Sequence, residues 1–172
     1  QLPAAILGQL ESFLLVALPL YLLMGEALGR SGAGADVYEA LERWLNRLPG
    51  GLAIASIYAC ALFGAMCGVS VAGVAAIGVV AVPEMLKRGY DKSLAAGAVT
   101  AAGALAVLIP PSISFIIYGA ISGVSVGKLF VAGIMPGVVL ATAMAIYVLG
   151  KGLLRPGLAP MVRQTLTWRQ ML

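Results

Sequence analysis

The chain has 172 residues, of which 61% are hydrophobic and only 10% are charged. Soluble domains carry about 25% charged residues, so this composition predicts an integral membrane protein. The formal net charge of +4 does not indicate nucleic-acid binding, because the basic residues lie between the apolar runs. With no histidine and only two cysteines, Cys60 and Cys67, a zinc site is not expected either.

The first predicted span covers residues 4–28, with Glu11 near one end and Glu26 near the other. Pro19 lies inside this span and is expected to bend it. Glu26 is a candidate functional carboxylate, since ionisable residues inside spans often are. It lies only four residues before Arg30, so we interpret it as a carboxylate at the membrane interface.

Residues 36–48 are too few to cross a membrane, and we predict an amphipathic helix that lies in the interface. Its charged residues fall away from one apolar helical face, which is made of Val37, Leu41, Trp44, Leu45 and Leu48. Trp44 is expected at headgroup level. The alternative is that this face packs against a soluble partner. Residues 48–51, Leu-Pro-Gly-Gly, are expected to end the helix.

An uncharged run at residues 52–83 has a break at its middle, at Cys67-Gly68-Val69-Ser70. A helix needs about 20 residues to cross the hydrocarbon core, so the run is too long for one crossing and too short for two. Half-helices of about 20 Å reach just past the middle of a core about 30 Å thick. We therefore predict a re-entrant hairpin with its tip near the midplane, followed by a charged turn at residues 84–92.

A second uncharged run, residues 93–127, is broken at residues 108–112, Leu-Ile-Pro-Pro-Ser. The two prolines remove two amide donors, and Ile109 is pushed out of the α region by the ring that follows it. This pattern predicts a discontinuous transmembrane helix. Irregular backbone at membrane depth is tolerated where it is buried in protein or lines a polar cavity, so two such breaks indicate a transporter's binding site. The alternative is that proline and glycine only kink packed helices.

Residues 129–150 form the last predicted span, with a candidate kink at Pro136. Residues 151–172 are a basic tail in which Trp168 could start another interfacial helix. If the hairpin returns to its own side, ten of the 11 Lys and Arg residues share one face and only Lys128 lies on the other. Basic loops stay in the cytoplasm, so we expect the tail there and the N-terminus outside.

The two breaks predict a binding site built mainly from backbone groups. Half-helices that end there present carbonyls with partial negative charge, which suit a small hard cation. Half-helices that begin there present free N–H groups, which suit an anion, and each serine can cap its helix or offer its hydroxyl. The expected anion-binding residues are Ser70, Ser112 and Ile113. The expected cation ligands are mainly backbone groups of Cys67, Gly68, Val69, Ser70, Leu108, Ile109, Pro110 and Ser112.

An ordered set of motifs runs through nearly the whole chain: Leu18-Pro19-Leu20 with Met24-Gly25-Glu26, Leu48-Pro49-Gly50-Gly51, Val82-Pro83-Glu84-Met85 with Arg88-Gly89-Tyr90-Asp91, Leu108-Ile109-Pro110-Pro111-Ser112, and Ser125-Val126-Gly127-Lys128-Leu129-Phe130. This set resembles the large membrane subunit of the tripartite ATP-independent periplasmic (TRAP) transporters. The chain departs from the family pattern where Gly68-Val69-Ser70 replaces the usual Gly-Ser-Ser and where Ala106 replaces a glycine.

The resemblance implies a permease of the bacterial inner membrane that works as a sodium-driven elevator and imports an organic acid. Sodium would be the coupling ion, and no cofactor is implied. The implied partners are a small membrane subunit, a periplasmic substrate-binding protein, the lipid bilayer and the organic-acid substrate, with no nucleic acid. The family has two inverted repeats, so the second repeat of the same polypeptide is expected on sequence beyond these residues.

Three other functions are alternatives to a TRAP-type permease. Another elevator-type sodium or proton symporter of dicarboxylates would share the same repeat but would need no binding protein. An intramembrane enzyme is disfavoured, because neither broken run contains His, Asp, Glu, Lys or Arg. A channel is also conceivable, but serine-flanked breaks at a closed site near the midplane fit alternating access better.

Overall fold

The computed structural model describes residues 13–155 and 157–160, and every regular element in this part of the chain is an α-helix. The prediction of an all-α membrane protein is therefore confirmed. Three stretches are long and apolar enough to cross a membrane, namely Ser70–Lys87, Lys92–Ser122 and Val126–Leu154. The helices are α2 (Phe13–Arg30), α3 (Ala33–Leu45), α4 (Gly51–Cys67), α5 (Ser70–Lys87), α6 (Lys92–Leu108), α7 (Ile113–Ser122) and α8 (Val126–Leu154).

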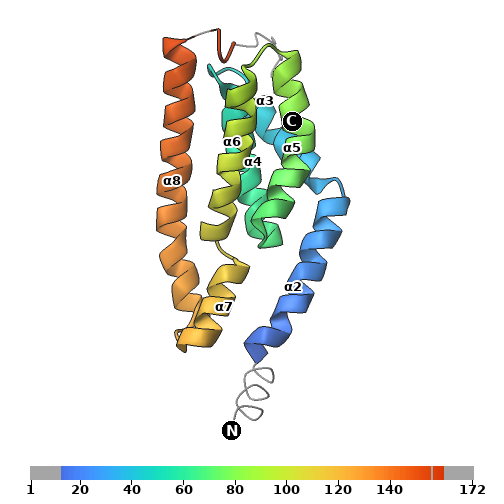
Figure 1. The fold of residues 1–172 in the computed structure, drawn as a ribbon, viewed down its shortest axis with the longest axis vertical. Helices are drawn as coiled ribbons and strands as arrows, with labels where there is room; N and C mark the ends of the chain where they lie inside the picture. Colours follow the sequence, from blue (N-terminus) through green and yellow to red (C-terminus); the bar gives the residue numbers. More distant parts are fainter. Residues whose placement is uncertain (1–12, 156, 161–172) are drawn as a thin grey trace.

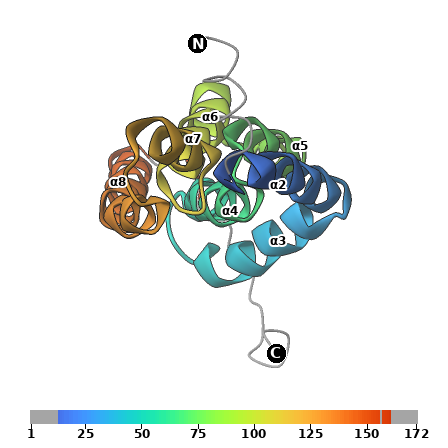
Figure 2. The same ribbon diagram turned by 90° about the horizontal axis from the view of Figure 1, so that it is seen from below.

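Helix α4 lies at the centre of the bundle, with the other helices arranged around it (Figure 2). It is apolar on every side, which suits a helix that is buried along most of its surface, and only Leu62 and Met66 are exposed. Leu52, Ile57 and Phe63 are fully buried along its length. The first half of the predicted hairpin therefore forms the core of the described chain.

Small residues bring α4, α5 and α6 into close contact. A Cβ added to Gly64 of α4 would overlap the Cβ of Ala106 on α6, and one added to Gly73 of α5 would lie 3.4 Å from the Cα of Gly64. A side chain at Gly103 of α6 would likewise overlap Val74. Such small-residue contacts allow the van der Waals packing that holds helices together in lipid. This close approach makes α4, α5 and α6 one compact block.

The hairpin arms α4 and α5 lie side by side, and the turn between them is level with the first half of α8 (Figure 1). The second arm is longer than predicted, because α5 continues through Pro83 to Lys87. Pro83 removes only one backbone amide donor, and the helix continues because the residues after it keep their hydrogen bonds. The Arg88 N–H, for example, still donates to the Glu84 carbonyl. At 18 residues α5 is long enough to cross a membrane by itself. Length alone therefore does not decide that the hairpin is re-entrant, and this placement stays a prediction.

The second broken run is less symmetric than expected. Helix α6 has 17 residues, but α7 has only 10, because Gly123 adopts a left-handed conformation with φ 71° and ends it. Helix α8 in turn is longer than the predicted span and runs for 29 residues, about 43 Å, straight through Pro136. Its two ends carry Lys128 and Lys151, whose long side chains can reach the headgroup region while their stems stay in lipid.

The amphipathic segment forms α3 three residues earlier than predicted, and its buried anchor is a residue that the apolar pattern did not include. Tyr38 is only 1% exposed, whereas Val37, Leu41 and Leu45 are partly buried against the core. Trp44 and Leu48 were expected on the same face, but both are exposed, with Trp44 78% exposed. The buried side of the helix is centred on Gly34 and Tyr38, which turns Trp44 away from the core, and Leu48 lies beyond the end of α3.

The segments that were expected to share a membrane face come together at one end of the bundle. Arg88 after α5 pairs with Glu42 of α3, and the Asp91 N–H donates to the Leu158 carbonyl at 3.0 Å. A Cβ added to Gly152 near the end of α8 would lie 3.1 Å from the Pro49 carbonyl carbon. Lys128 lies at the other end of α8, beside the end of α7 (Figure 1). The predictions for residues 4–12, including Glu11, and for residues 161–172, including Trp168, fall outside the described residues.

Candidate functional site

The two breaks meet inside the bundle. The Ile113 N–H, at the start of α7, donates to the Gly68 carbonyl, at the end of α4, with an N···O distance of 3.4 Å. Both breaks lie at the same level, beside the first half of α8 (Figure 1), where Gly133 and Gly137 contact Leu108 and Ile109. The structure thus brings together two stretches that the sequence separates by some 40 residues, and we call this meeting point the junction.

Local backbone preferences explain why the chain breaks at these positions. Gly68 has φ 67°, a left-handed conformation that glycine adopts at little cost, and its N–H closes α4 by donating to Gly64 at 2.7 Å. Val69 is then extended. On the other side Ile109 is extended at ψ 120°, as expected before a proline, and Ser112 is extended as well. Each break is therefore a short extended segment between two helix ends.

The helix ends at the junction leave polar backbone groups unpaired. Among the described residues, no backbone amide donates to the carbonyls of Met66 and Cys67, or to those of Val107 and Leu108. The first amides of α7 after Ile113 have no backbone acceptor in the same part of the chain. The ends of α4 and α6 therefore bring partial negative charge to the junction, and the starts of α5 and α7 bring partial positive charge.

Glycines of the two outer helices, α2 and α8, pack closely against these free carbonyls. A Cβ at Gly25 of α2 would lie 2.9 Å from the Cys67 carbonyl oxygen, and a Cβ at Gly133 of α8 would lie 2.7 Å from the Leu108 oxygen. Gly137, one turn further along α8, packs against the side chain of Ile109. Glycines therefore allow α2 and α8 to approach the breaks closely. The sequence did not predict the contact of Gly25 with Cys67.

The two serines take different positions at the starts of their helices. Ser70 is the first residue of α5 and not its N-cap, because the extended Val69 occupies that position. Ser112 is the N-cap of α7, but its side chain makes no capping hydrogen bond. The Ser112 hydroxyl is fully buried and has no hydrogen-bond partner among the described residues. A buried hydroxyl without a partner costs free energy, so Ser112 is the side chain best placed to receive a ligand.

The other predicted site residues lie at the junction with different degrees of burial. Cys67 is buried, and its thiol donates toward the Gly25 carbonyl at an S···O distance of 3.7 Å, which ties α4 to α2. Gly68 is buried too, and its carbonyl already accepts from the Ile113 amide. The half-buried members are Val69, Leu108, Ile109, Pro110 and Ile113. Their roles as ligands stay a prediction.

Sequence reasoning missed Tyr21 of α2. Its ring covers Gly68 so closely that a Cβ there would lie 2.9 Å from Tyr21 Cδ1 and 3.4 Å from the Pro111 oxygen. The Tyr21 hydroxyl is buried without a partner among the described residues. The helical spacing of Tyr21, Gly25 and Leu28, which are less exposed than the residues between them, could have pointed to this face.

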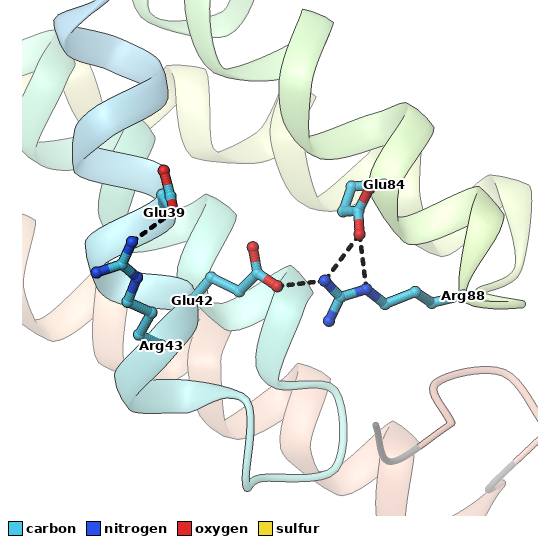
Figure 3. Close-up of polar contacts among 5 residues, drawn as sticks. All are labelled: Glu39, Glu42, Arg43, Glu84 and Arg88. Carbon is cyan, nitrogen blue, oxygen red and sulfur yellow. Dashed lines mark hydrogen bonds and ion pairs between the residues drawn. The ribbon is translucent and has the colours of Figure 1, made fainter. Parts of the chain in front are cut away.

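A separate ionic cluster fixes the charged end of the hairpin (Figure 3). The Arg88 guanidinium contacts Glu42 of α3 at 2.5 Å and Glu84 of α5 at 2.7 Å. The Arg88 and Glu42 side chains are only 17% and 14% exposed, whereas those of the nearby Arg43–Glu39 pair are 50% and 59% exposed. The cluster therefore attaches α3 to the hairpin through a largely buried contact.

Discontinuous helices that meet inside a multi-pass bundle, with free backbone groups and a buried hydroxyl at their junction, define a class of membrane transport proteins. A family model described as "Tripartite ATP-independent periplasmic transporter, DctM component" matches residues 2–171. The chain belongs to this family and is part of a TRAP transporter large permease subunit.

Characterised relatives agree with this family. The chain is similar to the isethionate TRAP transporter permease protein DctMQ of Oleidesulfovibrio alaskensis, with 41% identity over 80% of this chain and 22% of the relative. It matches the C4-dicarboxylate TRAP transporter large permease protein DctM of Pseudomonas aeruginosa with 40% identity over 80% of this chain and 32% of the relative. The ectoine TRAP transporter large permease protein TeaC of Halomonas elongata is 37% identical over 82% of this chain and 36% of its own length. The chain thus spans between about a fifth and about a third of these relatives.

Proposed function

We propose that this chain supplies one of the paired binding elements of a sodium-driven importer of a small organic acid. The observation that carries the proposal is the junction, where the Ile113 amide meets the Gly68 carbonyl beside the unpartnered hydroxyl of Ser112. In the complete permease a periplasmic binding protein would hand over the substrate, and a small membrane subunit would complete the transporter. The permease would lie in the bacterial inner membrane and would not be an enzyme.

The proposed chemistry uses both signs of partial charge at the junction. Sodium, a hard cation, prefers oxygen ligands, and the carbonyls at Cys67 and Leu108 can supply them with the Ser112 hydroxyl beside them. The carboxylate of the substrate would be held by the first amides of α7. The bond between Ile113 and Gly68 is long at 3.4 Å, so exchanging it for contacts to a ligand costs little.

The substrate is proposed only as a class. The three relatives are named for C4-dicarboxylate, isethionate and ectoine. The junction recognises an acid group through backbone amides, which are present whatever side chains the permease carries. The compact block of α4, α5 and α6 suits an elevator, because it can move as one body and carry the junction with it.

The function is tested with the complete permease, its small subunit and its binding protein in proteoliposomes. We expect uptake of a radiolabelled organic acid only when a sodium gradient, the binding protein and both membrane subunits are present. A proton gradient that replaces sodium without loss of rate would favour the other symporter class. Uptake without the binding protein would do the same.

Replacing Ser112 with alanine in the complete permease should weaken sodium activation of uptake about fivefold, which corresponds to about 1 kcal/mol for one neutral hydroxyl contact. Ser70→Ala is the matched variant and should have the smaller effect, because Ser70 is half-buried and Ser112 is fully buried. The sodium concentration for half-maximal uptake is measured for both. Unchanged sodium dependence in both variants would show that the breaks are structural kinks.

Single cysteines introduced at Arg47 and Lys87 should be inaccessible to a membrane-impermeant maleimide added from outside, whereas one at Lys128 should react. Arg47 and Lys87 lie near the end where the basic segments come together, and Lys128 lies at the start of α8. The background lacks Cys60 and Cys67, which are both buried. If Arg47 and Lys87 were labelled from opposite sides, residues 52–83 would cross the membrane once and would not form a hairpin.

A further inference from the structure

A groove that is separate from the junction runs between α6 and α8 at the basic end of the bundle. It has a volume of about 560 Å³, within the usual range of small-molecule sites. Its floor is Ile57 of α4, and its inner walls are formed by Leu94 and Ala98 on one side and by Met144 and Val148 on the other. The groove is therefore apolar over most of its depth.

The outer edges of the groove are two exposed rows of residues on facing helices. Ser93, Gly97 and Ala101 form the row on α6, and their small side chains leave the space open. Ala143, Tyr147 and Lys151 form the row on α8. Each row covers eight residue steps, about 12 Å of helix, which is close to the 15 Å or so of one hydrocarbon leaflet. The groove thus has the depth that one acyl chain occupies.

The mouth of the groove is polar and carries a cation. The Lys151 Nζ lies over the Tyr147 ring, 5.4 Å from its centroid, and no ion pair of Lys151 occurs among residues 13–155 and 157–160. Asp91 also lines the mouth, but its Oδ1 accepts from the Ser93 and Leu94 amides and so caps α6. Lys92 and Arg155, at the ends of the same two helices, leave this region with net positive charge.

We propose that the groove binds one phospholipid with an anionic headgroup. Its phosphate would contact Lys151 at the membrane interface, and one acyl chain would lie along Gly97 and Ala101 between α6 and α8. A cationic mouth at interfacial depth and an apolar channel as deep as one leaflet fit this ligand better than a soluble anion or a wholly apolar molecule. The proposal concerns a lipid site and does not depend on which substrate the permease carries.

The experiment uses the complete permease, purified and stripped of lipid in detergent. Binding of dioleoyl phosphatidylglycerol and of zwitterionic dioleoyl phosphatidylcholine is titrated by native mass spectrometry. Lys151→Gln should weaken phosphatidylglycerol binding about fivefold, the equivalent of about 1 kcal/mol for one basic residue at a lipid surface. Gly97→Leu should weaken binding of the same lipid at least tenfold, because the new side chain occupies the acyl channel. An added Cβ at Gly97 meets nothing within 4 Å, so this variant keeps its fold.

Matched controls separate lipid binding from general effects. Lys128→Gln removes an exposed lysine at the other end of α8, and Gly150→Leu changes a glycine of α8 that also has nothing within 4 Å and does not line the groove. Both controls should bind phosphatidylglycerol like the unaltered permease. Wild-type binding by Gly97→Leu or Lys151→Gln would overturn the proposal, as would equal affinity for the two lipids. Efficient cross-linking of Gly97→Cys to another segment of the permease would overturn it too, by showing that protein fills the groove.

Discussion

Replacing Pro110 and Pro111 together with alanine in the complete permease should abolish sodium-coupled uptake while the protein still inserts and remains at least as stable. The extended conformations of Ile109 and Ser112 hold α6 and α7 apart. Alanine restores two amide donors, which can bond to the carbonyls of residues 106 and 107 and carry the helix through the break. Each proline removed from a helix interior gains on the order of 3 kcal/mol, so the continuous helix should win.

Closing the break should remove the site for two reasons. The carbonyls at Val107 and Leu108 would become helix acceptors, and the Ile113 amide would be drawn away from Gly68. Uptake in proteoliposomes and the thermal unfolding midpoint are measured side by side. Pro83→Ala is the matched control, because Pro83 already lies inside the continuous helix α5 and its replacement should leave uptake nearly unchanged. Normal uptake by the double variant would show that the break is not the site. Failure to insert would show instead that the prolines are needed for packing.

Much of this fold follows from two simple features of the sequence. Apolar runs without charges gave the membrane class, and proline and glycine gave the positions of both breaks, because a missing amide at Pro110 or a left-handed residue at Gly68 acts locally. Helix ends were less predictable. Helix α5 passes through Pro83 and α8 passes through Pro136, since each proline removes one amide donor and the turns before and after it stay helical. The same residue type therefore ends one helix and is tolerated in another.

The candidate site was predictable as a meeting of backbone groups but not as a set of side chains. Nothing in the sequence of α2 shows that Tyr21 covers Gly68, because that contact depends on how α2 crosses the hairpin. The positions of the two serines also depend on one residue of register, since Val69 is the N-cap of α5, whereas Ser112 is itself the N-cap of α7. Local backbone preferences thus determine where the helices break. Tertiary packing determines which hydroxyl, here that of Ser112, is left without a partner among the described residues.

Replacing Arg88 with alanine should destabilise the permease far more than replacing Arg43, although both arginines pair with glutamates of α3 (Figure 3). Loss of Arg88 leaves Glu42 and Glu84 facing each other with side chains 14% and 31% exposed, and an uncompensated buried charge costs about 3–5 kcal/mol. Arg43 and Glu39 are at least half exposed, so that pair contributes no more than about 1 kcal/mol. The thermal unfolding midpoint of the purified protein is the measurement.

The same ionic cluster allows a rescue that separates charge from packing. If the penalty comes from the two carboxylates, adding Glu42→Gln and Glu84→Gln to the Arg88→Ala protein should recover much of the lost stability, because amides can be buried at lower cost than charges. Arg88→Met in place of Arg88→Ala should not recover it, since the apolar stem alone leaves both charges unpaired. Equal midpoints for Arg88→Ala and Arg43→Ala would mean that the attachment of α3 to the hairpin depends on Tyr38 and its apolar neighbours, and that the ionic cluster adds nothing.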